Sequence, residues 1–189
     1  MRRIGLDFDG VIANTDELKR EWFEKQGILL NKLNKSDIFK ELENQYSKEF
    51  LYYLYKGMSE YVFCKASMER IAPIDNAIKS IKNLSKQFEI YIISARNQGQ
   101  IMLLQDWLRK YKIDTYIKKI ISSSEEGKGK LQICKENNIS FFCDDDIRHL
   151  ICEGEYNIVK FLFNSKLCTV DEIYCVENWN DIVNYLERV

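Results

Sequence analysis

Short apolar runs alternate with helical patterns from Pro73 to the end of the chain. Residues 89–94 form an almost uninterrupted apolar run, and apolar side chains recur from Ile74 to Leu84 at the spacing of one helix face. Including the first apolar segment of the chain, the predicted strands are residues 4–8, 89–94, 119–122, 140–143 and 159–163. These runs lack the polar alternation of a half-exposed strand, as expected when both faces of a sheet are covered. The pattern therefore predicts an α/β fold with a doubly wound parallel five-stranded sheet and right-handed crossovers.

Two helical regions complete the predicted architecture. Apolar positions from Trp179 to Leu186 predict a closing helix, with Asn178 as its N-cap. Residues 15–69 are rich in Lys, Glu, Leu and aromatic residues, and predict several helices with breaks near residues 31–34 and at Gly57. We therefore expect a catalytic core of residues 1–14 and 70–189, with residues 15–69 inserted after the first strand as a small helical cap over the site.

Composition narrows the class of protein. The chain has 189 residues, 46% of them hydrophobic, which suits one domain with a modest insertion. Its 28 basic and 29 acidic side chains nearly cancel, so the clustered positive charge of a nucleic-acid-binding surface is not expected. No stretch approaches the ~20 apolar residues of a membrane helix, and the N-terminus lacks the apolar run of a signal peptide. We expect a cytoplasmic protein without a membrane partner, and a homodimer remains open.

The cysteines and the one histidine offer little chemistry by themselves. No cysteine pair has C-x-x-C spacing, which argues against a structural zinc site. Reduced, mostly buried thiols are expected, although the even count of six would allow disulfides. His149 is expected to be a loop or helix-start residue without a catalytic role.

Polar residues gather where the predicted strands end. In doubly wound sheets, ligands bind beyond the carboxyl ends of the strands. The first, second and fourth predicted strands run into polar segments, and a glycine-rich turn with two lysines precedes the fourth strand. The candidate site residues are Asp7, Asp9, Gly10, Ser94, Ala95, Arg96, Lys128, Lys130, Asp144, Asp145 and Asp146.

The carboxylates suit phosphoryl transfer. Several carboxylates together would hold a hard cation such as Mg²⁺, which offsets repulsion between an anionic nucleophile and a phosphate. Asp7 could attack phosphorus and form an aspartyl-phosphate. Asp9 could protonate the leaving oxygen and later activate water, a contribution of about 10²–10⁴-fold in rate.

The remaining candidates would bind the phosphate. Gly10 lets the backbone turn sharply near it. The Ser94 hydroxyl and the backbone N–H of Ala95 could donate to phosphoryl oxygens, and Lys130 could neutralise both the phosphate and the nucleophile. Arg96 could grip a phosphate in a bidentate manner or could be a surface cation at a helix start, and both interpretations remain open.

These residues resemble the haloacid dehalogenase (HAD) superfamily of phosphohydrolases. The segment from Ile4 to Thr15, IGLDFDGVIANT, is similar to the first motif of that family. The resemblance implies a HAD-like Rossmannoid core with Asp7 as nucleophile and Asp9 as acid/base, Asp9 lending its backbone carbonyl to the metal. The second aspartate favours phosphate chemistry over carbon–halogen cleavage.

The resemblance also assigns the other motifs. It implies that Ser94 is the phosphate-binding hydroxyl and Lys130 the motif-three lysine, with Lys128 as the alternative. Asp144 and Asp145 match the metal-binding motif. Asp145 is favoured as the metal ligand, and Asp144 and Asp146 stay open.

A narrower resemblance is to the cytosolic 5'(3')-deoxyribonucleotidases and their bacterial relatives. It rests on the early helical cap, the segments 72–77 and 90–96, the short gap from Lys130 to Asp144, and Trp179 before the last helix. It implies a magnesium-dependent phosphatase of nucleoside monophosphates. Aromatic rings of the cap could stack on a nucleobase, although packing of the cap helices on each other and on the core is the favoured interpretation for any one ring. These rings belong to Phe50, Tyr52, Tyr53, Tyr55, Tyr61 and Phe63.

Two alternatives remain open. The first is a phosphatase of the same mechanism that acts on another small phosphate ester or on a nucleic-acid 3' end. The second is a non-catalytic protein that binds phosphate or a nucleotide to regulate a partner. The combined presence of Asp7, Asp9, Ser94 and a lysine argues against the second alternative.

Overall fold

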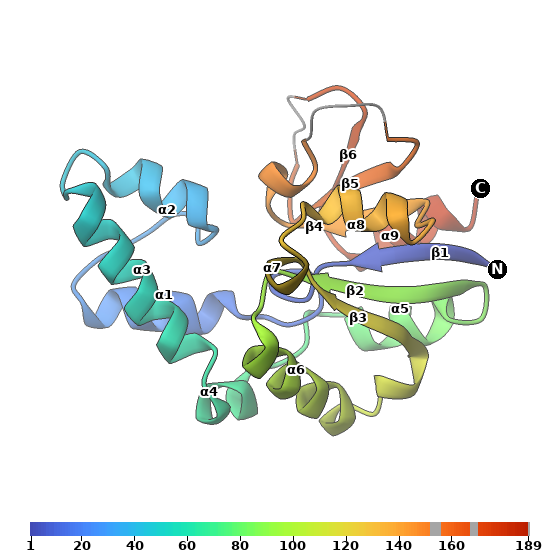
Figure 1. The fold of residues 1–189 in the computed structure, drawn as a ribbon, viewed down its shortest axis with the longest axis horizontal. Helices are drawn as coiled ribbons and strands as arrows, with labels where there is room; N and C mark the ends of the chain where they lie inside the picture. Colours follow the sequence, from blue (N-terminus) through green and yellow to red (C-terminus); the bar gives the residue numbers. More distant parts are fainter. Residues whose placement is uncertain (152–155, 167–169, 189) are drawn as a thin grey trace. The chain divides into compact units, whose positions relative to one another are not determined.

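The computed structural model describes residues 1–151, 156–166 and 170–188. Over these residues a parallel six-stranded sheet has the order β3-β2-β1-β4-β5-β6 (Figure 1). Its strands are β1 (Arg2–Leu6), β2 (Phe88–Ser94), β3 (Ile117–Ser122), β4 (Phe141–Asp144), β5 (Val159–Phe163) and β6 (Ile173–Val176). The predicted α/β class and parallel topology are confirmed.

The α-helices are α1 (Asp16–Lys25), α2 (Lys35–Leu42), α3 (Lys48–Val62), α4 (Lys65–Arg70), α5 (Ala77–Leu84), α6 (Gln98–Lys110), α7 (Ser123–Glu126), α8 (Lys130–Glu136) and α9 (Trp179–Leu186). Short 3₁₀ helices are η1 (Asp114–Tyr116) and η2 (Ile147–His149). The predicted closing helix is α9, and Asn178 caps it by accepting from the backbone N–H of Asn180.

The sixth strand corrects the prediction of five. β6 has four residues and pairs with β5 alone, at the edge of the sheet. Its Tyr174 is exposed, and its Ile173 belongs to the buried core. So short a run at an edge carries too little periodicity to be recognised in the sequence.

The register of the central strands brings three strand ends to one edge of the sheet. Leu6, the last residue of β1, lies beside Ile92 of β2 and Cys143 of β4. Consequently Asp7, which follows β1, lies at the same carboxyl edge as Ser94 and Asp144, the last residues of β2 and β4. On one face of the sheet, apolar residues of β2, β4 and β5 pack with residues of α8 in one buried cluster. The sheet thus supplies a rigid base for polar side chains at its edge.

The chain divides into two compact units, Met1–Ala13 with Pro73–Val189, and Asn14–Ala72. The second unit holds α1 to α4, drawn in blue to green in Figure 1. The predicted end of the helical insertion, between residues 69 and 70, falls inside α4. In the structure the second unit ends slightly later, before Pro73.

Gly57 does not break a helix, contrary to the prediction. It lies inside α3, where a Cβ atom would come 2.9 Å from Cζ2 of Trp22. The missing side chain therefore permits close packing of α3 against α1. The predicted break at residues 31–34 does separate α1 from α2.

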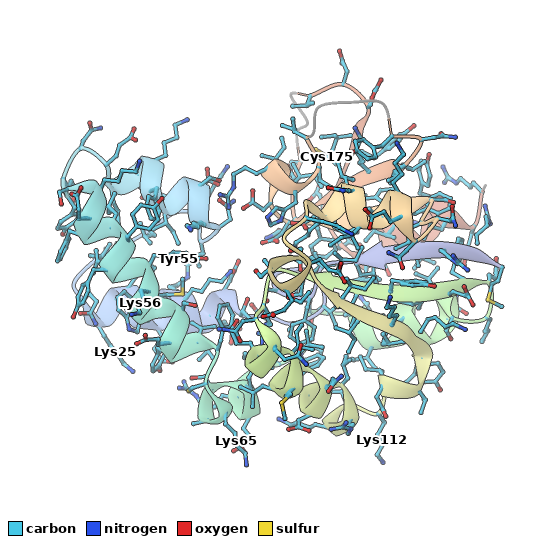
Figure 2. All side chains as sticks on the ribbon, viewed as in Figure 1. Lys25, Tyr55, Lys56, Lys65, Lys112 and Cys175 are labelled. Atoms are coloured by element: carbon cyan, nitrogen blue, oxygen red, sulfur yellow. The ribbon has the colours of Figure 1, made fainter. Side chains whose placement is uncertain are left out.

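The cysteines differ in state. Cys134 and Cys143 are free and buried as expected, whereas Cys64 is free and exposed. Cys175 of β6, labelled in Figure 2, is disulfide-bonded, which corrects the expectation of reduced thiols for this residue. The spacing of cysteines along a sequence carries no signal for which of them meet. Cys152 and Cys168 lie outside the described residues.

Among the described helices, none is both long and apolar enough to cross a membrane.

Candidate active site

The loop after β1 presents Asp7 at the centre of the carboxyl edge. The backbone N–H of Asp7 donates to the carbonyl of Cys143 at 2.8 Å, which continues the pairing of β1 with β4. The backbone then turns back, and Gly10 adopts a φ of +76°. A side chain at Gly10 would be strained there and would also overlap the Asp145 carboxylate. The loop therefore requires glycine for two independent reasons.

Lys130 joins two of the site's carboxylates. It is the first residue of α8, and its Nζ lies 2.9 Å from Oδ2 of Asp7 and 2.8 Å from Oδ2 of Asp144. All three side chains are buried. The other candidate lysine, Lys128, lies outside this group.

Lys128 occupies a different environment from Lys130. Its partly exposed ammonium pairs with Glu136 at 2.7 Å and with Glu126 at 3.5 Å. The structure thus brings Lys130, and not Lys128, to Asp7.

Burial and charge shift the pKa values of this group in opposite directions. Burial raises the pKa of Asp7 to about 6, with help from the negative charges of Asp144 and Asp9 and against the attraction of Lys130. Burial opposes the charged form of Asp144 as well, but Lys130 and His149 hold its pKa below the ordinary value. Desolvation works against the Lys130 ammonium too, yet Asp144 and Asp7 raise its pKa. The group is best described as a protonated lysine between an ionised Asp144 and an Asp7 whose pKa is raised to about 6.

The three consecutive aspartates that begin with the last residue of β4 point to different partners. Asp144 is fully buried, and His149 Nδ1 lies 3.1 and 3.2 Å from its two oxygens. The carboxylate of Asp145 lies against Gly10. Asp146 caps η2 by accepting from the backbone N–H of Arg148 at 3.0 Å, and it pairs with the Arg148 side chain. The structure therefore places Asp146 in local capping contacts.

A divalent cation fits the donors at this edge. Asp7, Asp144 and His149 each offer a ligand atom, and these atoms lie within 4.8 Å of one another. Two buried carboxylates form the oxygen-rich surroundings that Mg²⁺ prefers. Asp145, the ligand that the resemblance favours, lies against the neighbouring Gly10.

The loop after β2 carries the predicted phosphate-binding groups. Ser94 is buried at the strand end, and its Oγ accepts from the backbone N–H of Arg96 at 3.3 Å. Three successive serines, starting at the last residue of β3, donate to backbone carbonyls at the end of β2 and in the loop that follows it. The bonds run from Ser122 to Arg96 at 2.5 Å, from Ser123 to Ser94 at 3.4 Å and from Ser124 to Ala95 at 2.6 Å. Ser94 and Ala95 are thus held at the carboxyl edge by hydrogen bonds from the adjacent strand end.

Arg96 is not a surface cation, because it is only 2% exposed. Its Nε donates to Oδ2 of Asp9 at 2.9 Å, and its Nη2 donates to Oδ1 at 2.8 Å. The structure thus joins two predicted site residues in a bidentate ion pair that the sequence did not suggest.

Two features of the site were missed in the sequence. His149 was expected to have no catalytic role, yet it contacts Asp144. Its position five residues after Asp144 in an acidic segment was a usable signal. The serines at the end of β3 were also missed, since serine at the end of a strand is ordinarily a helix cap, a role that Ser122 fills for α7.

No family model matches the chain, and no curated protein matches it by sequence. Solved structures, however, match it over almost its full length. A hydrolase of the haloacid dehalogenase-like family from Streptococcus pneumoniae has a TM-score of 0.69 at 15% identity, with 98% of both chains covered. A predicted phosphatase from Clostridium acetobutylicum has a TM-score of 0.68 at 16% identity, with 100% of this chain and 99% of that chain covered.

A third structure was solved with magnesium. This HAD-hydrolase from Bacillus subtilis has a TM-score of 0.64 at 15% identity, with 98% of both chains covered. Identities this low establish the fold and nothing finer. The chain thus has the HAD-like α/β fold, with a helical insertion after β1.

Proposed function

We propose that the protein is a magnesium-dependent phosphoric monoester hydrolase that works through a phosphorylated Asp7. The observation that carries this proposal is the Lys130 ammonium, buried within 2.9 Å of Asp7 and 2.8 Å of Asp144. A cation between two carboxylates at a ligand-binding edge suits the charge of a bound phosphate. Asp9, two residues after the nucleophile, supplies an acid/base group on the same loop.

In the first half of the reaction, a carboxylate oxygen of Asp7 attacks phosphorus and the ester P–O bond breaks. Asp9, which pairs with Arg96 in this structure, must carry a proton at this stage and donates it to the departing alkoxide oxygen. Lys130, Ser94 and the backbone N–H of Ala95 donate to the phosphoryl oxygens as charge moves onto them. The product of this half is an alcohol and an aspartyl-phosphate.

In the second half, water attacks phosphorus and the bond to Asp7 breaks. Asp9, deprotonated after the first half, accepts the proton from water. Inorganic phosphate leaves, and Asp7 returns to its starting state. The two halves balance, because Asp9 gives one proton and regains one.

Asp7, Asp144, Asp145 and the backbone carbonyl of Asp9 would hold Mg²⁺, with His149 beside Asp144. A bound cation would offset the repulsion between the Asp7 carboxylate and the phosphate dianion. The magnesium in the Bacillus subtilis structure supports this part of the proposal.

The proposed substrate is a nucleoside monophosphate. The support is the resemblance to the deoxyribonucleotidases, and the helical unit, taken by itself, carries exposed rings on α3. Phe50 is 42% exposed, Tyr52 50% and Tyr53 73%. Tyr55, labelled in Figure 2, is instead half-buried under the ammonium of Lys35, 5.0 Å from its ring centroid. Exposed rings can stack on a base without sequence preference.

The test is phosphate release with Mg²⁺ across ribo- and deoxyribonucleoside monophosphates and sugar phosphates. We expect turnover that is lost in Asp7→Asn and in chelator, and retained in Asp75→Asn, which changes an exposed carboxylate. Preference for sugar phosphates would replace the nucleotide proposal with the wider class of small phosphate esters. No turnover of any ester, with phosphate still bound, would favour the non-catalytic alternative.

A further inference from the structure

The guanidinium of Arg96 holds both oxygens of the Asp9 carboxylate. The two donor–acceptor distances are 2.9 and 2.8 Å, and the side chains are 2% and 17% exposed. Two parallel N–H···O bonds from a planar group define the rotation of a carboxylate as well as its position. The single ammonium nitrogen of a lysine could not make these two parallel hydrogen bonds, so it would leave the rotation of the carboxylate undefined.

Arg96 is itself held at several points. Its backbone N–H donates to Oγ of Ser94 at 3.3 Å, and its carbonyl accepts from Oγ of Ser122 at 2.5 Å. The guanidinium carbon lies 5.0 Å from the centroid of the Phe8 ring, and Phe8 is fully buried. The Arg96 guanidinium, called the fork below because two of its N–H groups bind Asp9, is therefore attached to a backbone that the ends of β2 and β3 hold in place.

The distribution of positive charge favours the same interpretation. Lys130 lies at the nucleophile, where the phosphate must arrive. The charge of Arg96 is balanced by Asp9, so contact with a phosphate would require breaking a buried bidentate pair. Breaking such a pair costs free energy, because the partner that stays buried is left charged and without its hydrogen bonds.

We propose that Arg96 is a positioning residue, which orients the Asp9 carboxylate for proton transfer and is not a ligand of the substrate phosphate. The inference rests on the proposed function, because it gives Asp9 its acid/base role. Proton transfer requires the carboxylate within hydrogen-bond reach of the leaving oxygen, and displacement by 1 Å can cost about 10²-fold in rate. Loss of the fork should therefore lower kcat and leave phosphate affinity intact.

The experiment compares wild type, Arg96→Lys and Arg96→Gln in steady-state turnover and in the binding of tungstate, a phosphate mimic. We expect kcat to fall about 100-fold in Arg96→Gln and about 10-fold in Arg96→Lys, while KM and the tungstate Kd stay within about threefold of wild type. In an Asp9→Asn background, measured by single turnover, Arg96→Gln should cause no further loss. If Arg96→Gln does not fold, Arg96→Lys carries the comparison, since it keeps a cation at the buried position.

Two results would overturn the inference. One is an increase of about tenfold or more in KM and in the tungstate Kd with kcat preserved, which would make Arg96 a phosphate ligand. The other is an unchanged or increased kcat in Arg96→Gln. If wild type turns over no ester, the proposed function fails, and the tungstate Kd alone then decides whether Arg96 binds phosphate.

Discussion

The role proposed for Asp9 depends both on its place in the sequence and on a tertiary contact. Its position two residues after Asp7 is a property of the sequence, whereas its bidentate partner Arg96 comes from 87 residues away. The loop that holds Asp9 is constrained by Gly10 and by Trp179, whose Nε1 donates to the Val11 carbonyl at 2.8 Å. The position of the Asp9 carboxylate therefore depends on contacts from distant parts of the chain as well as on its own loop.

The first residue-scale prediction concerns Asp9→Asn. Turnover should fall by about 10²–10⁴-fold, because the amide cannot exchange a proton with the leaving group or with water. Binding of Mg²⁺, measured by calorimetry, should persist, because the proposed contact is the backbone carbonyl. Asp75→Asn is the matched control. Near-normal turnover in Asp9→Asn would show that the acid/base assignment is wrong.

The second residue-scale prediction concerns Lys130→Met. Removing this ammonium leaves Asp7 and Asp144 buried side by side, and unpaired buried charge typically costs about 3–5 kcal/mol. We expect a loss of that order in the free energy of unfolding at pH 7.5, measured in urea, together with loss of turnover. Lys128→Met should leave the unfolding midpoint unchanged, because that ammonium is paired at the surface. Equal effects of the two variants would contradict the assignment of Lys130.

At the scale of elements, the ends of neighbouring parallel strands create the site. The ends of β1, β2 and β4 lie in register, and each adds a polar residue at the same edge. The end of β3 contributes in a different way, since its serines donate to the carbonyls of the β2 loop. The proposed phosphate-binding groups are thus supported by an element that carries no predicted site residue.

The helical unit gives a prediction at this scale. Gly57→Ala should destabilise the protein by about 1 kcal/mol, because a Cβ 2.9 Å from Trp22 overpacks α3 against α1 and outweighs the better helix propensity of alanine. Gly99→Ala is the matched helical control, with 3.6 Å to its nearest contact, and should be neutral or stabilising. Unfolding in urea checks both. Equal stability of the two variants would contradict the packing role of Gly57.

At the scale of the whole molecule, the fold and the proposed chemistry rest on different observations. Structures at about 15% identity share the fold over nearly the full chain. The fold explains why polar residues meet at one edge, and the identity of those residues supports the phosphatase proposal. Global stability should report the electrostatics of this edge, because its charged groups are buried.

The pH dependence of stability follows from Asp7. Its folded pKa of about 6 lies above the ordinary value of 3.8, so the folded state binds this proton more tightly. The resulting stability is present below about pH 4 and is lost as the pH rises through 6. In chelator, wild type should lose about 2 kcal/mol relative to Asp7→Asn between pH 4 and pH 7.

Urea unfolding of both proteins at several pH values checks this expectation. Chelator is needed because a bound cation would lower the pKa of Asp7. Asp75→Asn should follow wild type throughout. A difference between wild type and Asp7→Asn that does not change with pH would show that Asp7 ionises normally.

The sequence by itself determined the α/β class, the alternation of helices and strands that implies a parallel sheet, the N-cap of α9 at Asn178, and the candidate residues at the strand ends. These are local properties, since periodicity and capping depend on residues a few positions apart. The tertiary structure decided what depends on distant contacts: the pairing of Arg96 with Asp9, the contact of His149 with Asp144, the different surroundings of Lys130 and Lys128, and the packing of Gly57 on Trp22. It also revealed β6 and the disulfide-bonded state of Cys175. Sequence spacing cannot specify such contacts, because which side chains meet is set by register, packing and burial in the folded chain.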